Sequence, residues 1–356
     1  MGVIRVVHDY GLPSFELRKT GPWNPESEGP TVLLGSGMTS RVSQHTLSDH
    51  ETAKTKSAKL IALKKFTPAS SASVKNSTVY ETIIREIRLL CHPLLSKHPN
   101  IVRLYAAGWT KGERFPALVM ECGSHGSLDY LIRSSWAGLN DTQLHQVRRH
   151  LTIDIAMGLY AIHKANFIYG DLKPHNILVM SHPSKSRRAI AKLTDFSGSS
   201  IMPSQGGGQP VHYTPLWCAP EVINKDPDVD WKKADVYSYG LVVGSLWAGL
   251  RTEGGFGAGQ LQNGSSCFLA DFYLSAITKK EEIDLLWIAK SEVDEAANLS
   301  SLLTKKLEVS ITNEIDRAHI LRTLTPTLQP YFWLRPNAES LCQSLRILAL
   351  QVKRQI

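Results

Sequence analysis

The residues with the clearest chemical potential lie in the stretch NFIYGDLKPHNILVM, which begins at Asn166. It places Asp171, Lys173 and Asn176 just before an apolar run that is typical of a strand. An aspartate can accept the proton of a hydroxyl group while that oxygen attacks phosphorus, and an asparagine side chain can bind Mg²⁺. A polar turn ahead of a strand would explain the same residues, so the interpretation needs partners elsewhere in the chain.

A second acidic position follows in KLTDFSGSS, where Asp195 comes nineteen residues after Asn176 and directly after an apolar approach. A carboxylate in this place can bind the metal ion that bridges the phosphates of a nucleotide. Asn176 and Asp195 are therefore the candidate metal ligands.

A lysine lies inside an apolar run, because IALKKF places Lys64 in a predicted buried strand. An unpaired buried ammonium group is costly, so Lys64 needs an anionic partner, and Glu86 on the polar side of the following helix is the candidate. An edge-strand lysine that faces water and a solvated helical glutamate are the alternatives.

Two glycines, Gly35 and Gly37, lie between predicted strands in LGSGMTSRV. Such a turn can lie close over phosphates and offer them backbone N–H groups. Ser40 stands where a third glycine would complete a G-x-G-x-x-G pattern, and a plain hairpin turn explains the segment as well.

The elements that must position these residues change in character along the chain. Strands are predicted over residues 31–47, 59–66, 100–109 and 115–122, with one amphipathic helix over 80–90. A long helix is predicted over 142–165, and the later residues are mostly helical. Its apolar face is formed by Leu144, Val147, Leu151, Ile155, Leu159 and Ile162. The order predicts a small β-rich lobe, a larger helical lobe and a cleft between them.

Composition narrows the class of protein. The 356 residues are 42% hydrophobic and 20% charged, with a net charge of +8, which is ordinary for a globular protein of two lobes. The sequence has no dense run of basic residues with interleaved aromatics, so it predicts no nucleic-acid binding. Five scattered cysteines, no apolar leader and no membrane-length apolar run predict a soluble, cytoplasmic protein that binds no membrane. The oligomeric state has no signature in the sequence.

Taken together, these motifs resemble the signature set of the eukaryotic protein kinases, serine/threonine branch. Further motifs in the same order are HPNIVRLY, WCAPE, ADVYSYG and RPNAESL, so the resemblance covers residues 31–352. It implies an α+β, protein kinase-like bilobal fold. The expected domains are an N-terminal extension over 1–28, the small N-lobe and hinge over 29–123, and the larger C-lobe over 124–356.

The resemblance implies a catalytic role for four residues. Asp171 would be the catalytic base, and Lys173 would steady the γ-phosphate. Lys64 would contact the α- and β-phosphates and pair with Glu86.

The resemblance also implies ATP and Mg²⁺ as cofactors, with Mg²⁺ held by Asn176 and Asp195. Met120 would be the gatekeeper beside a hinge that offers backbone groups to adenine. The residues expected around ATP are Leu34, Gly35, Gly37, Val42, Ala62, Lys64, Met120, Glu121, Gly123 and Leu178.

Two further features follow from the resemblance. Lys173, together with Thr214 near the expected base, points to protein substrates with Ser or Thr acceptors. Glu221 and Arg335 would form a buried ion pair, and Asp235 would anchor the stack of apolar side chains that includes Tyr169.

The chain departs from the family pattern at three positions. Tyr169 and Gly170 stand where the family has a His-Arg pair, and Ser197 replaces the glycine after Asp195 and Phe196. The missing arginine usually gathers a phosphorylated activation segment, so we expect activity without phosphorylation of that segment.

Three functional readings follow. The first is an active kinase that transfers the γ-phosphoryl group of Mg-ATP to Ser or Thr hydroxyls of proteins. The second is a pseudokinase, a nucleotide-binding or scaffold module. The third is a small-molecule phosphotransferase of the aminoglycoside or choline kinase type, whose loop often reads Gly-Asp-Leu, although such enzymes usually lack an Ala-Pro-Glu segment.

Overall fold

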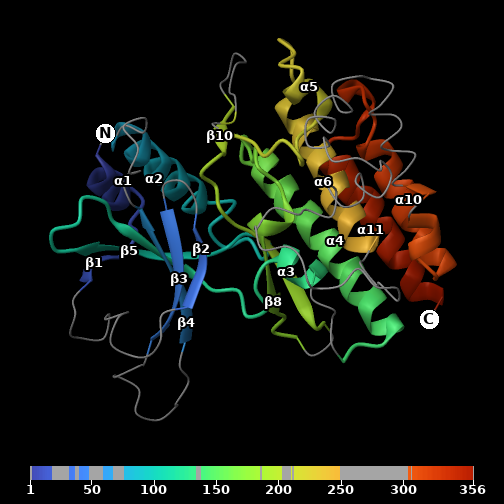
Figure 1. Cartoon of the computed structure of the whole chain (residues 1–356), viewed down its shortest axis with the longest axis horizontal. Helices are drawn as coiled ribbons and strands as arrows, with labels where there is room; N and C mark the ends of the chain where they lie inside the picture. The colour runs from blue at the N-terminus through green and yellow to red at the C-terminus, as the bar shows by residue number, and fades with distance from the viewer. Residues whose placement is uncertain are drawn as a thin grey trace, which may run out of the picture. The chain divides into compact units, whose positions relative to one another are not determined.

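The computed structural model describes residues 2–17, 32–36, 40–47, 59–66, 76–133, 138–184, 187–202, 210, 212–248, 304–305 and 307–355. The chain divides into two compact units (Figure 1). The N-terminal unit consists of Met1–Gly126 with Thr194–Ser197, and the C-terminal unit of Ser127–Leu193 with Gly198–Ile356. Each unit has its own core.

The N-terminal unit is built on a six-stranded sheet with the order β1-β5-β6-β4-β3-β2. β1 pairs with β5 in parallel, and the other neighbouring strands are antiparallel. Its elements are α1 (Val3–Asp9), β1 (Ser14–Leu17), β2 (Val32–Ser36), β3 (Ser40–Leu47), β4 (Lys59–Phe66), α2 (Asn76–Leu90), β5 (Leu104–Thr110) and β6 (Ala117–Glu121).

Side chains alternate along β4, so the two faces of the sheet carry different residues. Ile61 and Leu63 are buried in an apolar cluster with Leu17, whereas Lys64 points to the opposite face because successive residues of a strand alternate. On α2, Val79, Ile83 and Ile87 repeat every fourth residue and are fully buried. The strands and the helix predicted for this region are therefore confirmed.

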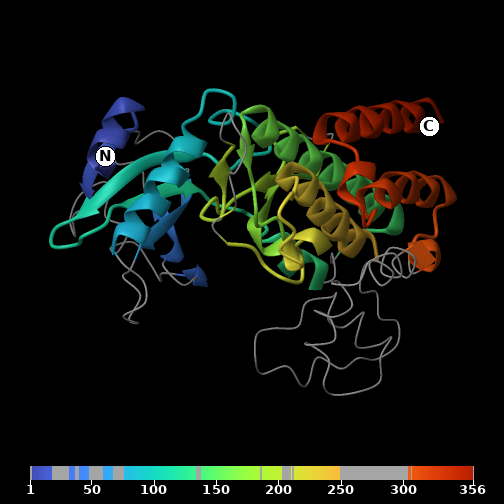
Figure 2. The ribbon, with the colours of Figure 1, turned by 90° about the horizontal axis from the view of Figure 1, so that it is seen from above.

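The segment predicted as an N-terminal extension contributes two elements to the N-terminal unit. Helix α1 packs against α2, and β1 extends the sheet beside β5 (Figures 1 and 2). Residues 2–17 are thus built into the unit, and residues 18–28 lie outside the described ranges.

The C-terminal unit is mainly helical and carries two small two-stranded sheets, β10-β7 and β8-β9. Its helices are α3 (Leu128–Arg133), α4 (Asp141–Lys164), η1 (Pro174–Asn176), α5 (Pro220–Ile223), α6 (Trp231–Ala248), α10 (Glu314–Thr327), η2 (Phe332–Leu334) and α11 (Ala338–Gln355). Its strands are β7 (Phe167–Ile168), β8 (Ile177–Ser181), β9 (Ala189–Leu193) and β10 (Ser200–Ile201).

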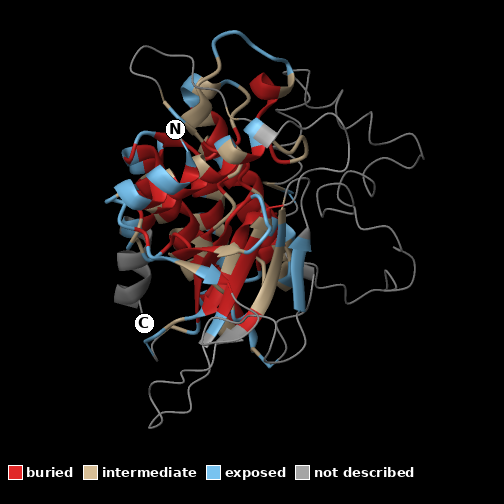
Figure 3. Ribbon diagram, turned by 90° about the vertical axis from the view of Figure 1, so that its left-hand side faces the viewer, coloured by how far each residue is buried: buried red, intermediate tan, exposed pale blue. Residues whose placement is uncertain are grey.

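Helix α4 is the central helix of this unit. It begins at a capping box, in which the Asn140 side chain accepts from the backbone N–H of Gln143 and the Gln143 side chain accepts in return. All six apolar residues predicted to form its inner face are buried. Figure 3 colours the ribbon by burial, with the buried residues in red. β9, α6 and α11 pack against it. The small β-rich unit and the larger, mainly helical unit are the α+β composition expected from the sequence.

Helix α6 differs from α4, because every residue from Ala234 to Ala248 is buried, so that no face of this stretch is exposed to water. Among the described residues, none of the helices combines the length and the apolar character that a membrane span requires.

Candidate active site

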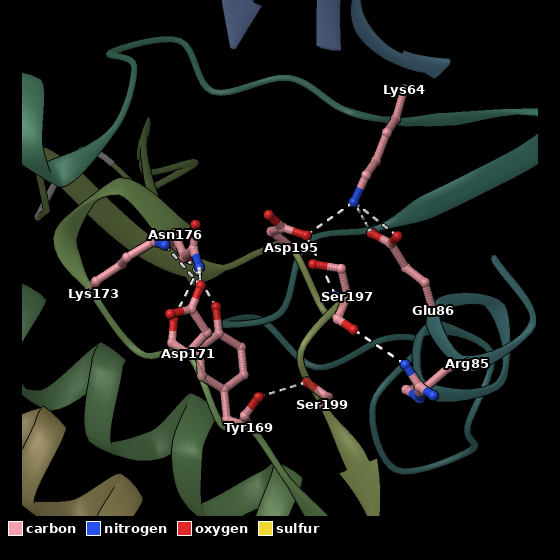
Figure 4. A network of polar contacts seen from close by, with 10 residues as sticks. All are labelled: Lys64, Arg85, Glu86, Tyr169, Asp171, Lys173, Asn176, Asp195, Ser197 and Ser199. Atoms are coloured by element: carbon pink, nitrogen blue, oxygen red, sulfur yellow. Dashed lines mark hydrogen bonds and ion pairs between the residues drawn. The ribbon is translucent and has the colours of Figure 1, made fainter. Parts of the chain in front are cut away.

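Lys64 and Glu86 form a buried ion pair inside the N-terminal unit (Figure 4). The Lys64 ammonium group donates to both Glu86 carboxylate oxygens, at 2.9 and 2.8 Å. The two residues are 2% and 0% exposed, so the pair is shielded from water. This is the partner that the sequence predicted for a lysine in a buried strand.

The same ammonium group also binds Asp195, at 3.0 Å from Nζ to Oδ1. Asp195 has a φ of +55°, which places a non-glycine residue in the left-handed region. Such backbone strain is concentrated at functional sites, where the surrounding structure holds it. The Asp195 side chain remains 42% exposed, so its carboxylate can reach a ligand as well as Lys64.

Electrostatics favour the charged forms of Lys64 and Asp195. Burial alone would lower the pKa of Lys64, but Asp195 and Glu86 raise it above its ordinary value. Burial alone would raise the pKa of Asp195, but Lys64 and Ser197 hold it well below its ordinary value. Burial raises the pKa of Glu86, and the attraction of Lys64 opposes that rise. Lys64 is therefore a fixed cation that two carboxylates orient.

Two residues that the sequence interpretation did not assign to this site also contribute hydrogen bonds to it. The backbone N–H of Ser197 donates to Asp195 Oδ1 at 3.4 Å, and Arg85 donates to the Ser197 carbonyl at 3.2 Å (Figure 4). Arg85 directly precedes Glu86 on α2, and this adjacency was the available signal. The helix that carries Glu86 thus also holds the segment that carries Asp195.

Several of the predicted ATP-binding residues face the same side of the sheet as Lys64. Val42 is the cross-strand neighbour of Lys64, and Ala62 is the neighbour of Met120. Neighbouring residues on paired strands point to the same face of a sheet. This face therefore gathers small and apolar side chains beside the ammonium group, which suits a flat aromatic base.

The other predicted ATP-binding residues occupy three places. Leu34 and Gly35 lie in β2, where both are exposed, and Glu121 ends β6 ahead of Gly123. Leu178 lies in β8 of the C-terminal unit. Gly37 lies outside the described residues.

Asp171 lies at the centre of a second polar network, which belongs to the C-terminal unit. Its Oδ1 accepts a hydrogen bond from the Thr214 hydroxyl at 2.6 Å, and its Oδ2 lies 2.8 Å from the Lys173 ammonium group. Lys173 also donates to the Thr214 hydroxyl oxygen at 2.7 Å. Asp171 is 5% exposed, so these charge-assisted bonds fix the orientation of its carboxylate.

Asn176 joins this network through its amide nitrogen (Figure 4). Nδ2 donates to the backbone carbonyl of Asp171 at 2.9 Å and to its carboxylate at 3.0 Å. Because the amide nitrogen is committed to Asp171, the side-chain oxygen is the atom that a cation would use.

Asp235 holds the backbone of the loop that leads to Asp171. Its carboxylate accepts from the backbone N–H groups of Tyr169 and Gly170, each at 2.9 Å, and lies 2.9 Å from His163 Nε2. The Tyr169 ring is buried, and its hydroxyl donates to the carbonyl of Asn176 at 3.2 Å. Tyr169 therefore fills the place where the resemblance led us to expect histidine, and its hydroxyl group adds a hydrogen bond across the loop.

Gly170 has a φ of +82°, and its surroundings leave no room for a side chain. A Cβ atom built on it would lie 2.6 Å from Pro210 and 3.1 Å from the carbonyl oxygen of Gly198. Next to it, the Ser199 hydroxyl donates to the Tyr169 carbonyl at 2.9 Å. The segment that follows Asp195, which contains Ser199 and Pro210, is thus fastened to the loop of Tyr169 and Gly170 by close packing and a neutral hydrogen bond.

The donor set fits the cofactors that the resemblance implies. Asp195 and Asn176 offer carboxylate and amide oxygens, the ligand types that Mg²⁺ prefers, and Lys64 offers a fixed cation for phosphate oxygens. Lys64, Glu86 and Asp195 meet in one group of the N-terminal unit. Asp171, Lys173 and Asn176 meet in one group of the C-terminal unit. The ion pair expected between Glu221 and Arg335 is also formed there, with two bonds of 2.6 and 2.9 Å.

The family model described as "Protein kinase domain" matches residues 31–310. The chain is 32% identical over 166 residues to "Serine/threonine-protein kinase dst2" of Dictyostelium discoideum, which is 46% of this chain and 13% of that protein. It is 30% identical over 172 residues to "Serine/threonine-protein kinase ATG1a" of Arabidopsis thaliana, which is 48% of this chain and 25% of that protein. The chain thus spans a quarter or less of the length of these relatives.

Proposed function

The chain belongs to the protein kinase family, and on this premise we propose that it is an active kinase. It transfers the γ-phosphoryl group of Mg-ATP to Ser or Thr hydroxyls of protein substrates. The names of its relatives, both serine/threonine kinases, support this class of acceptor.

The observation that carries the proposal is the bonding of Asp171. Thr214, Lys173 and Asn176 all lie at hydrogen-bond distance from its carboxylate, so a candidate base, a cation and a candidate metal ligand meet at one point. In the proposed mechanism Asp171 accepts the proton of the acceptor hydroxyl as the oxygen attacks phosphorus. Lys173 neutralises charge that develops on the transferred group.

The N-terminal group has a complementary role in the proposal. Lys64 holds phosphate oxygens and is itself oriented by Glu86, so that the phosphates are positioned before transfer. Mg²⁺ bound by Asp195 and Asn176 would supply further neutralisation of phosphate charge. Catalysis then comes mainly from positioning and charge rather than from a covalent intermediate.

The second candidate function is a nucleotide-binding scaffold. Ser197 in place of the family glycine favours it, because Ser197 restrains Asp195 and is bound by Arg85. In this alternative the segment is held in one state and phosphoryl transfer is slow or absent. Partner binding would then be the function.

An assay of phosphoryl transfer from labelled Mg-ATP distinguishes between these candidate functions. The full chain is compared with Asp171→Asn and with Asp228→Asn, a matched change at an exposed aspartate of the same unit. We expect transfer to Ser or Thr with the wild type and the control, and a loss of at least about a hundredfold with Asp171→Asn.

Nucleotide binding is measured on the same samples by thermal shift. Binding without transfer in all three proteins would support the scaffold. Transfer to a small hydroxylated molecule and to no protein would support a small-molecule phosphotransferase. A cytoplasmic location stays a prediction.

A further inference from the structure

The proposed kinase reaction assigns no function to the N-terminal segment, residues 2–17. Its helix α1 is seven residues long, and a helix of that length is not stable by itself in water. It therefore forms because it buries apolar side chains against the rest of the N-terminal unit.

The buried face of α1 is regular. Val3, Val6 and Val7 follow the spacing of one helical face and are 5%, 1% and 4% exposed, whereas Ile4 on another face is 73% exposed. The element against which α1 packs is α2, and the two helices lie side by side in Figures 1 and 2. α2 is also the helix that carries Glu86 and Arg85.

A rigid turn joins α1 to β1. The N–H of Gly11 donates to the carbonyl of His8 at 2.9 Å, and that of Leu12 donates to the carbonyl of Val7 at 3.0 Å. With Gly11 at a φ of +58°, this pair of bonds is a Schellman motif, which fixes the direction in which the chain leaves the helix.

β1 anchors the N-terminal segment to the face of the sheet that lies opposite to Lys64. Leu17 packs in the apolar cluster with Ile61 and Leu63 of β4, the strand that also carries Lys64. Gly108 makes room for it, because a Cβ atom there would lie 2.7 Å from Leu17. The segment thus contacts the helix of Glu86 through α1 and the strand of Lys64 through β1.

We propose that α1 is a built-in brace for α2, in which Val6 is the central positioning residue that keeps Glu86 beside Lys64. In this role α1 supplies from within the chain the apolar support that α2 needs. The kinetic part of the proposal rests on the proposed kinase function, and the structural part does not.

The test uses the full chain with Val6→Ser and two controls. Ile4→Ser makes the matching change at an exposed position of the same helix, and Val6→Ile keeps the side chain apolar. Hydrogen exchange is followed in peptides from α2, from β3 and β4, and from α4 in the other unit. Burying a hydroxyl without a partner weakens packing, so we expect exchange in α2 to rise about tenfold in Val6→Ser alone.

The same variants are assayed for phosphoryl transfer. If the wild type is active, kcat/KM should fall about tenfold in Val6→Ser and remain within about twofold of wild type in both controls. An active Val6→Ser variant with wild-type kcat/KM overturns the proposal, as does unchanged exchange in α2. Equal loosening of β3 and β4 overturns it too, because a general loss of stability would explain that result. If no variant and no wild type transfers phosphate, the proposed function fails, and exchange in α2 still decides whether the brace exists.

Discussion

Pro210 packs against Gly170, at a backbone position in the left-handed region where a side chain has no room. This glycine stands where the resemblance led us to expect arginine, and Pro210 and the carbonyl of Gly198 lie directly on its backbone. An arginine side chain at position 170 is therefore incompatible with the observed approach of Pro210.

The first prediction concerns this close approach. Gly170→Ala should destabilise the protein by about 2 to 4 kcal/mol, because left-handed backbone strain and a clash with Pro210 add together. Gly138→Ala is the matched control, since Gly138 has a φ of +83° and a Cβ atom built on it would meet nothing within 4 Å. It should cost only about 1 to 2 kcal/mol. Equal losses in urea unfolding would show that Pro210 does not crowd this position.

The second prediction concerns regulation. Because Ser199 is buried and bonded to the Tyr169 carbonyl, the segment is fastened to the loop without a phosphate group. Activity should therefore survive complete phosphatase treatment, measured as kcat before and after, with phosphate removal checked by mass spectrometry. A loss of turnover on dephosphorylation would contradict this expectation.

The third prediction concerns Thr214. Thr214→Ala should lower kcat about ten- to a hundredfold with little change in the KM for ATP, because Asp171 and Lys173 lose their shared hydroxyl group. Thr214→Ser keeps the hydroxyl and should recover most of the rate. If Thr214→Ser is as slow as Thr214→Ala, then the methyl group and its packing matter more than the hydrogen bonds.

The fourth prediction concerns the buried ion pair. Glu86→Gln should lower kcat/KM about ten- to a hundredfold, because Lys64 loses the carboxylate that orients it. Its cost in stability should be about 1 to 3 kcal/mol, below the usual cost of breaking a buried pair, since Asp195 still neutralises Lys64. Glu81→Gln, at an exposed position of α2, is the control for both measurements. An active Glu86→Gln variant would remove Glu86 from the proposed mechanism.

The fifth prediction concerns pH. Although burial opposes it, Lys64 holds the pKa of Asp195 well below the ordinary value of 3.8. The stabilisation from the Asp195 carboxylate is therefore complete above that ordinary value and is lost as the pH falls toward the lower pKa of the folded state. The stability advantage of the wild type over Asp195→Asn should narrow between about pH 5 and about pH 3.

Urea unfolding at several pH values measures this difference. Asp228→Asn, at an exposed position, controls for general effects of acid. An advantage that stays constant down to pH 3 would show that the Lys64–Asp195 ion pair does not form in solution.

Much of the fold follows from local sequence patterns. The apolar spacing along residues 142–165 predicted α4 and its buried face, and the run over 59–66 predicted β4 with a lysine that needs a partner. These predictions succeeded because periodicity and the cost of burying a charge are properties of neighbouring residues. The roles assigned to the individual site residues, and the boundaries of the lobes, stay predictions.

Sequence alone therefore determined the class of fold, the family and the residue types that could do the chemistry. The tertiary structure decided which side chains and backbone groups contact one another. Arg85 reaches Ser197, Pro210 crowds Gly170, and Leu17 packs where Gly108 leaves room. It also placed two parts of the predicted N-terminal extension, as a helix on α2 and a strand beside β5. The physical reason is that such contacts join residues far apart in the chain, and their distances are set by how whole elements pack rather than by any local pattern.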